Sequence, residues 1–314
     1  MSGLGRAVIA GLVVGSMLCA CGTDASDPDS ASDVAGRVEV GEGRHLYLDC
    51  RGEGSPTVVL QSGFGNAGDI WELSETDSPA VQPALAETTR VCAYDRPGSL
   101  VTTTTVEDGK VSDSGRTEPA RSDQVPMPRD PAEVVAELHE LLDAAGEAGP
   151  YLLVGHSMGG PLQALFAATY PDETAGLVLV DAPMPELRDS VTPDQWELIA
   201  HPKLAPGTYP EEYIAESYSM DMLLDEVEAA GPLPSVPVAV LVRGREEPMP
   251  DPPPENADDY QALAAAWPRA QAAFAASLPD AELTTVPGTT HHIQNQRPDA
   301  VVDAVDKVRN RAKG

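Results

Sequence analysis

Short apolar runs alternate with longer amphipathic stretches along most of the chain. The apolar runs are rich in Val, Leu and Ala and end at turn residues, which predicts strands. These strands cover residues 38–40, 45–50, 57–61, 89–94, 151–154, 176–180, 237–242 and 282–286. Apolar residues at a spacing of three or four predict helices, which cover residues 131–145, 158–169, 257–277 and 299–311. Strands that alternate with helices of this length predict a mostly parallel sheet with helices on both faces.

Two segments interrupt this alternation. Residues 98–129 are polar and carry a run of threonines, and we expect them to form a loop. Residues 183–234 form an insert with Trp, Tyr and Met at short helical spacings. The insert lies where an α/β enzyme could carry a lid, although extra packing against the core would explain the same pattern.

The first 36 residues differ in composition from the rest of the chain. Arg6 precedes an apolar run over residues 7–18, which is shorter than the about 20 residues that a membrane-spanning helix needs. We therefore interpret residues 1–20 as an export signal peptide. Residues 21–36 are rich in Ser, Asp, Gly and Ala and predict a flexible tether, so the folded domain is expected over residues 37–314.

The predicted signal peptide ends in a recognisable motif. Leu18-Cys19-Ala20-Cys21 resembles the lipobox of bacterial lipoproteins, in which Cys is the first residue of the mature protein. The resemblance implies a diacylglyceryl thioether on Cys21, which would hold the exported protein at the outer face of the bacterial cell membrane. An ordinary signal peptide with an incidental cysteine is the alternative.

Two of the four cysteines remain for the folded domain, Cys50 and Cys92. Cys19 would leave with the signal peptide, and Cys21 would carry lipid. Two thiols in an exported protein favour a disulfide, which would here join two predicted strands. A pair of buried thiols is the alternative.

A short motif carries the strongest chemical signal of the chain. Gly155-His156-Ser157-Met158-Gly159 directly follows an apolar strand and leads into a predicted helix. In such a G-x-S-x-G turn the glycines relieve crowding, and the serine hydroxyl is exposed at the amino end of the helix. The motif in this context predicts that Ser157 is a nucleophile.

From about residue 37 to its end, the chain resembles the α/β-hydrolase superfamily. Besides the serine motif, the resemblance rests on residues 57–65 (third strand and oxyanion loop), 90–98 (the following strand and turn), 177–182 (sixth strand), 238–244 (seventh strand) and 288–298 (histidine loop). Ser62 replaces the histidine that is usual in the oxyanion loop. The family implies an α/β-hydrolase fold with an eight-stranded, mostly parallel sheet, a small helical lid insert over residues 183–234, and esterase- or lipase-like serine hydrolase activity.

A catalytic serine needs a histidine and a carboxylate. A free serine hydroxyl is a weak nucleophile at neutral pH, so a histidine must accept its proton and a carboxylate must orient that histidine. His291 lies seven residues before Pro298, which is the spacing that this family shows before its last helix. We therefore expect His291 to be the base, with the adjacent His292 as the alternative.

Two acidic residues could orient that histidine. Asp181 ends the predicted sixth strand, and Glu247 follows the predicted seventh strand. Members of the superfamily can place the acid at either position. The exported hydrolases that the chain most resembles do not reliably carry an acid after the seventh strand, which favours Asp181 and leaves Glu247 as its rival.

Two backbone N–H groups should stabilise the oxyanion that forms during acyl transfer. They belong to Met158, directly after the nucleophile, and to Phe64, directly after Gly63. The side chains of Phe64, Met158 and Trp71 could line an acyl pocket, and plain core packing would explain them equally well.

Charge and composition narrow the class of partner. The 314 residues include 50 acidic and 20 basic side chains, and the formal net charge is −30. This argues against nucleic acid as a partner, because its binding needs a basic face. The sequence contains neither a Cys/His cluster with metal-ligand spacing nor a glycine-rich phosphate loop, so we expect neither a metal nor a cofactor.

These observations predict a membrane-tethered serine hydrolase that cleaves small carboxylic esters through an acyl-enzyme. A peptidase or amidase of the same fold is the nearest alternative. A catalytically silent lipoprotein that binds a component of the envelope is an alternative of a different class. The residues do not indicate the acyl-chain preference or the oligomeric state.

Overall fold

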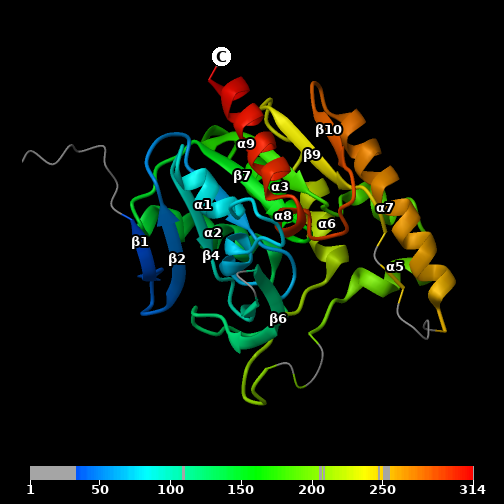
Figure 1. The fold of residues 1–314 in the computed structure, drawn as a ribbon, viewed down its shortest axis with the longest axis horizontal. Helices are drawn as coiled ribbons and strands as arrows, with labels where there is room; N and C mark the ends of the chain where they lie inside the picture. The colour runs from blue at the N-terminus through cyan, green and yellow to red at the C-terminus, as the bar shows by residue number, and fades with distance from the viewer. Residues whose placement is uncertain are drawn as a thin grey trace, which may run out of the picture. The chain divides into compact units, whose positions relative to one another are not determined.

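One sheet of eight strands forms the centre of the part of the chain that the structure describes (Figure 1). The structure is a computed structural model, and it describes residues 33–107, 110–204, 207, 209–246, 248–249 and 255–313. In sheet order the strands are β1 (Val34–Glu39), β2 (His45–Arg51), β4 (Val91–Tyr94), β3 (Val58–Gln61), β7 (Tyr151–His156), β8 (Thr174–Val180), β9 (Val238–Arg243) and β10 (Glu282–Val286). β2 pairs antiparallel with both of its neighbours, and all pairs from β4 onward are parallel. This confirms the expected eight-stranded, mostly parallel sheet.

Helices cover both faces of the sheet. They are α1 (Val81–Ala86), α2 (Pro131–Ala144), α3 (Gly159–Thr169), α4 (Pro185–Arg188), α5 (Pro193–Ala200), α6 (Met220–Ala229), α7 (Ala257–Ser277), α8 (Ile293–Gln296) and α9 (Pro298–Ala312). α2, α3 and α7 bury apolar residues in one core cluster, and α1 and α9 bury theirs in a second cluster. In β3, Val59 belongs to the first cluster, whereas Val58 and Leu60 belong to the second, because successive side chains of a strand point to opposite faces. Among the described helices, none has a stretch long and apolar enough to cross a membrane.

Helix α2 begins as its sequence predicts. The Asp130 carboxylate accepts a hydrogen bond from the backbone N–H of Ala132 at 2.9 Å. Pro131 takes the first helical position, where the missing N–H of proline leaves no hydrogen bond unmade. The helix buries its apolar residues at a spacing of three or four, which are Val134, Val135, Leu138, Leu141 and Leu142. The helix predicted over residues 131–145 is therefore confirmed to within one residue.

The described fold begins earlier in the chain than the sequence predicts. β1 starts at Val34, and residues 34–36 pair with β2. The predicted tether over residues 21–36 therefore extends too far at its carboxyl end. The predicted strand over residues 38–40 is too short for the same reason. The hydrogen bonds of this edge strand come from its backbone, which pairs without needing an apolar run of side chains. The predicted signal peptide and Cys21 lie outside the described residues.

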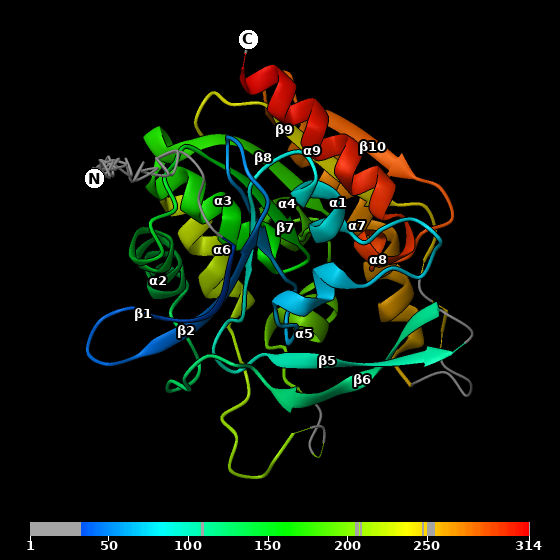
Figure 2. The same cartoon turned by 60° about the vertical axis from the view of Figure 1, so that its left-hand side comes forward.

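A β-hairpin occupies part of the segment for which we predict a loop. β5 (Leu100–Glu107) and β6 (Lys110–Pro119) pair antiparallel as a separate two-stranded sheet, and Figure 2 shows this hairpin apart from the central sheet. The prediction of a loop throughout residues 98–129 is therefore wrong. Threonines at 102–105 are β-branched and favour extended backbone, but a polar run lacks the apolar alternation that identifies a strand in the sequence.

Backbone hydrogen bonds join the start of this hairpin to the segment after β3. Leu100 N donates to Gly65 O at 3.0 Å, and Ala67 N donates to Leu100 O at 3.0 Å. Thr102 N donates to the carboxylate of Asp69 at 2.7 Å, in the short 3₁₀ helix η1 (Gly68–Glu72). Desolvation by burial raises the pKa of Asp69 to about 6.

Replacing Asp69 with asparagine is expected to stabilise the protein at pH 8 and to change its stability little below pH 4. The pKa of Asp69 rises from the ordinary value of 3.8 to about 6 in the fold, so the folded form binds the proton more tightly. The resulting stabilisation is complete below pH 3.8 and is lost as the pH rises through about 6. A rise of this size corresponds to at most about 3 kcal/mol.

Urea unfolding of wild type and D69N at a series of pH values measures this effect. The difference in unfolding free energy between the two proteins should grow between pH 4 and pH 7, in favour of the variant. A difference that does not change with pH would show that Asp69 titrates normally in the fold.

The insert over residues 183–234 contains α4, α5 and α6. Its α5 begins with a capping box, in which the side chains and backbones of Thr192 and Gln195 bond each other reciprocally. Trp196, Leu223 and Leu224 join the same core cluster as α2 and α3. Packing against the core is therefore part of what the insert does.

Cys50 and Cys92 form the expected disulfide. They lie directly opposite each other on the antiparallel strands β2 and β4, and both are fully buried. The bond therefore joins the antiparallel edge of the sheet to its parallel part.

Replacing both cysteines with alanine is expected to lower the free energy of unfolding by about 3–4 kcal/mol. The disulfide closes a loop with a sequence separation of 42 residues, which restricts the unfolded chain. Urea unfolding with and without a reductant measures the effect. Reductant should destabilise the wild type and leave the double variant unchanged; a double variant as stable as the oxidised wild type would contradict the prediction.

Candidate active site

Ser157 lies in the tight turn between β7 and α3, at the carboxyl end of a parallel strand. Its backbone φ of 51° is in the left-handed region, which residues other than glycine rarely adopt. Ser157 N donates to Val180 O at 3.0 Å, and Gly160 N donates to Ser157 O at 2.8 Å. A serine held in this strained conformation between a strand and a helix presents its hydroxyl away from the backbone.

Close backbone packing requires the two glycines of the motif. A Cβ atom on Gly155 would lie 2.4 Å from the carbonyl oxygen of Gly159. A Cβ atom on Gly159 would lie 2.3 Å from the carbonyl oxygen of Gln61, at the end of β3. Both separations are far shorter than van der Waals contact and involve backbone atoms. The glycines thus let α3 start directly against the sheet, which determines where Ser157 lies.

Ser157, His291 and Asp181 form one chain of hydrogen bonds. His291 Nε2 lies 2.9 Å from Ser157 Oγ, and His291 Nδ1 lies 2.6 Å from Asp181 Oδ2. Asp181 directly follows β8, and His291 lies in the loop between β10 and α8. Asp181 is fully buried, whereas Ser157 and His291 are partly exposed. The structure therefore brings together the three residues for which the sequence predicts catalytic roles.

A buried arginine, Arg243, also holds the Asp181 carboxylate. The Arg243 guanidinium donates to Asp181 Oδ2 at 3.2 Å, and Arg243 N donates to Asp181 Oδ1 at 3.3 Å. Arg243 is the last residue of β9, next to β8 in the sheet. A buried carboxylate needs such partners, because an isolated charge is costly to bury. Glu247, the rival acid, lies outside the described residues.

Trp267 of α7 supports the same two residues. Its indole N–H donates to the backbone oxygen of Asp181 at 3.3 Å. Its ring meets the His291 ring edge to face, with the centroids 5.7 Å apart. Neither Arg243 nor Trp267 is predicted from the sequence to belong to the site. The local signal for Arg243 is an arginine at the end of an otherwise apolar strand. Its partner, Asp181, is 62 residues away in the sequence.

The structure distinguishes between the two adjacent histidines. His291 is the one that contacts Ser157, and the His292 ring lies beside it with a centroid separation of 5.5 Å. His156 Nε2 lies 2.9 Å from the backbone oxygen of His291. Because a carbonyl oxygen only accepts, His156 carries a proton on Nε2 and donates it to the histidine loop. His156 therefore helps to fix the backbone at His291.

The loop after β3 runs close to Ser157. A Cβ atom on Gly63 would lie 3.0 Å from Ser157 Cβ and 2.9 Å from His156 Nδ1, so only glycine leaves room for this approach. Phe64 follows Gly63 and packs partly buried against the core, and Met158 follows Ser157 and is buried. Both predicted oxyanion-hole residues therefore adjoin the serine turn.

Trp71 is a core residue. It is fully buried in η1 and belongs to the core cluster of α1 and α9, whereas Met158 and Phe64 pack with the other cluster. Of the two interpretations of Trp71, the structure supports core packing.

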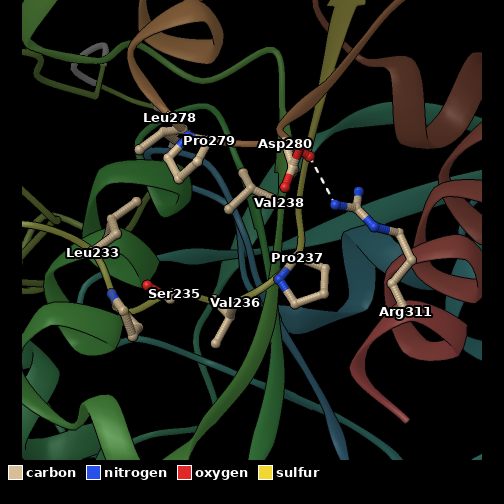
Figure 3. Close-up of a pocket in the computed structure, with 10 residues that line it drawn as sticks. Leu233, Ser235, Val236, Pro237, Val238, Leu278, Pro279, Asp280 and Arg311 are labelled. Atoms are coloured by element: carbon tan, nitrogen blue, oxygen red, sulfur yellow. Dashed lines mark hydrogen bonds between the residues drawn. The ribbon is translucent and has the colours of Figure 1, made fainter. Parts of the chain in front are cut away.

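A cavity of about 510 Å³ lies at the opposite end of β9 from Asp181 and Arg243. Figure 3 shows its lining, in which Arg311 donates a hydrogen bond to the backbone oxygen of Asp280 at 2.8 Å. The cavity adjoins Val238, the first residue of β9, whereas Arg243 is the last. The length of the strand separates this cavity from the serine.

One group of possible metal ligands lies within reach of one another in the described part of the chain. It consists of Cys50, Cys92 and Glu147. The disulfide occupies both sulfur atoms, so this group offers a single ligand, the Glu147 carboxylate.

The sequence of residues 58–304 matches the model of the alpha/beta hydrolase family. The chain belongs to this family. Membership supports hydrolase activity and agrees with the eight-stranded, mostly parallel sheet.

Individual proteins resemble this hydrolase to different extents. An uncharacterized protein of Schizosaccharomyces pombe is 35% identical over 158 residues, which are 44% of this chain and 26% of that protein. The chain thus spans about a quarter of the length of this relative. A thermophilic esterase from Thermogutta terrifontis has a TM-score of 0.54 and 18% identity, covering 90% of this chain and 100% of that one. A hydrolase from Pseudomonas aeruginosa has a TM-score of 0.52 and 18% identity, covering 90% and 99%. At this identity the two structures demonstrate a shared fold.

Proposed function

We propose that this protein is a serine hydrolase that cleaves carboxylic esters. One observation carries the proposal: Asp181, His291 and Ser157 are hydrogen-bonded in series, with the serine in a strained turn. A carboxylate, an imidazole and a hydroxyl in this order form the arrangement that activates a serine for attack on a carbonyl carbon.

The reaction proceeds in two halves. Ser157 Oγ attacks the ester carbonyl carbon while His291 Nε2 accepts the hydroxyl proton, which forms a tetrahedral intermediate. His291 then returns this proton to the leaving alkoxide, and the carbon–oxygen bond of the ester breaks to leave an acyl-enzyme and an alcohol. Water, deprotonated by His291, attacks the acyl carbon, and Ser157 leaves with that proton as the carboxylic acid departs.

Asp181 and two backbone amides assist both halves. Asp181 keeps the proton of neutral His291 on Nδ1 and stabilises the imidazolium that forms, and Arg243 keeps the carboxylate in place. The N–H groups of Met158 and Phe64 donate to the oxyanion of the tetrahedral intermediate. Such donors act strongly because they are already oriented when the charge develops.

Ester substrates are favoured over amides by one of the comparisons. The Thermogutta terrifontis neighbour, which shares the fold over 90% of this chain, is named as an esterase. A peptidase or amidase would use the same three residues, so a matched pair of substrates separates the classes. We expect turnover of a p-nitrophenyl ester and at most slow turnover of the p-nitroanilide with the same acyl group.

A fluorophosphonate tests the proposed function directly, since it reacts covalently with an activated serine. The wild type should be labelled at a single site, which mass spectrometry of the digested protein should locate at Ser157. A panel of p-nitrophenyl esters of increasing chain length should then define the acyl-chain preference. Folded protein that neither reacts with the probe nor turns over any ester would overturn the proposal in favour of a silent envelope-binding protein.

The sequence of the first residues supports a further proposal on location. Leu18-Cys19-Ala20-Cys21 resembles a lipobox, and we infer that lipid on Cys21 anchors the enzyme outside the cytoplasm. In cells of a bacterial host, the full chain should fractionate with membranes, and Cys21→Ala should release it. Membrane association that survives this substitution would overturn the anchor and leave the hydrolase proposal unaffected.

A further inference from the structure

A buried ion pair lies directly beneath the loop that carries Phe64. Arg96 follows β4, and Glu216 comes from the insert, between α5 and α6. Arg96 Nε donates to Glu216 Oε1 at 2.7 Å, and the side chains are 2% and 0% exposed. A pair of charges this deeply buried is costly unless every charged atom is used. Arg96 Nη2 also donates to Glu216 Oε2 at 3.2 Å, and both side chains form further hydrogen bonds with one loop.

Both members of the ion pair form hydrogen bonds with the backbone of residues 62–65. Arg96 Nη1 donates to Ser62 O and Arg96 Nη2 donates to Gly63 O, each at 2.7 Å. Glu216 Oε2 accepts from the backbone N–H of Gly65 at 2.6 Å. Three peptide groups of a four-residue loop are thus held by charge-assisted hydrogen bonds, which are stronger than neutral ones.

The bond to Gly63 O bears directly on the oxyanion hole. The carbonyl of Gly63 and the N–H of Phe64 belong to the same planar, trans peptide group, so they point in opposite directions. Arg96 fixes that plane from the carbonyl side, which aims the Phe64 N–H away from Arg96. The positively charged guanidinium that donates to this carbonyl oxygen also polarises the peptide group, which makes the Phe64 N–H a better donor.

We propose that Arg96 and Glu216 are positioning residues that orient the Phe64 N–H toward the oxyanion. The inference rests on the proposed ester hydrolysis by Ser157. Glu216 also ties the insert to this function, because its own N–H donates to Gly98 O at 2.7 Å, next to the arginine turn. The insert is therefore part of the apparatus that sets the oxyanion hole, in addition to packing on the core.

The chain provides a matched control at the other end of β4. Arg90 immediately precedes this strand, and its guanidinium pairs with Glu147 at 2.6 Å, with side chains 3% and 4% exposed. Glu147→Gln removes a buried carboxylate facing an arginine, as Glu216→Gln does. The Arg90 side chain bonds the backbone oxygen of Gly52, which is not in the oxyanion loop. General loss of stability should thus affect both variants.

The test compares Glu216→Gln with Glu147→Gln for a p-nitrophenyl ester and for a trifluoromethyl ketone, which forms a tetrahedral adduct with an activated serine. Misplacement of one oxyanion donor should lower kcat of E216Q about 10- to 100-fold and change KM less than about threefold. The trifluoromethyl ketone should bind more weakly by a similar factor. E147Q should keep kcat and inhibitor affinity within about threefold of wild type.

Glu216→Asp serves if E216Q does not fold. It keeps the charge that neutralises Arg96 and shortens the reach to Gly65, so kcat should fall about 3- to 10-fold at unchanged KM. Equal kcat values for E216Q and E147Q, or a loss confined to KM, would overturn the inference while leaving an active, fluorophosphonate-reactive wild type. An inactive and unreactive wild type would instead overturn the proposed function, and this inference with it.

Discussion

Replacing Ser157 with alanine is expected to lower kcat for ester hydrolysis by a factor of about 10⁵ to 10⁶. The Ser157 hydroxyl is the atom that would attack the ester, and its oxygen lies 2.9 Å from the nitrogen that would accept its proton. Without it no acyl-enzyme can form, and only water attack assisted by the oxyanion hole remains. Steady-state assays with a saturating p-nitrophenyl ester measure this loss of kcat.

The variant should fold like the wild type. Alanine at position 157 meets the same φ of 51° that serine already adopts, so the backbone strain is unchanged. Its urea unfolding curve should therefore superimpose on that of the wild type to within about 1 kcal/mol. Fluorophosphonate labelling should disappear. A folded S157A that retains a tenth of the wild-type kcat would mean that another residue is the nucleophile.

Replacing Asp181 with asparagine is expected to lower kcat by a factor of about 10⁴, with a much smaller change in KM. Asparagine has no charge to stabilise the His291 imidazolium. Its amide also offers an N–H toward His291 Nδ1, which favours the tautomer whose Nε2 carries the proton and cannot accept one from Ser157. We expect kcat to depend strongly on this substitution, because the Asp181 carboxylate oxygen lies only 2.6 Å from His291 Nδ1.

The matched comparison is Glu247→Gln, which should keep kcat within about threefold of wild type. The opposite result, a large loss in E247Q and a small one in D181N, would transfer the acid to Glu247. D181N also removes the carboxylate that faces buried Arg243, so we expect it to lower the folded fraction of the protein. Titrating the active sites by a burst of p-nitrophenol restricts kcat to the folded fraction.

Several features could be predicted because they depend on neighbours in the chain. The run from Tyr151 into Gly155 and Gly159 carries a local pattern that predicts a strand, a turn and a helix. Helix α2 is likewise encoded by its cap at Asp130 and its apolar spacing. The position of His291 before Pro298 and of Asp181 after an apolar strand carried enough local pattern to nominate both.

Other features could not be predicted, because their signals lie far apart or have no period. The hairpin of β5 and β6 consists mostly of polar residues without regular alternation, so only backbone pairing reveals it. The start of β1 at Val34 depends on the presence of β2 as a partner. Arg243 has no recognisable motif around it, and its role follows from the adjacency of β8 and β9.

By itself, the sequence determined the strands of the central sheet, the helices α2, α3, α7 and α9, and the serine turn, since these follow from periodicity and steric limits within a few residues. The family was indicated by the resemblance of its motifs to those of known hydrolases. Only the tertiary structure decided that His291 and not His292 contacts Ser157, and that Arg243 faces Asp181. It alone brought Glu216 to Arg96 across 120 residues. Hydrogen bonds of this kind depend on distances of a few tenths of an ångström between side chains on different elements, and these are set only when the whole sheet and its helices pack.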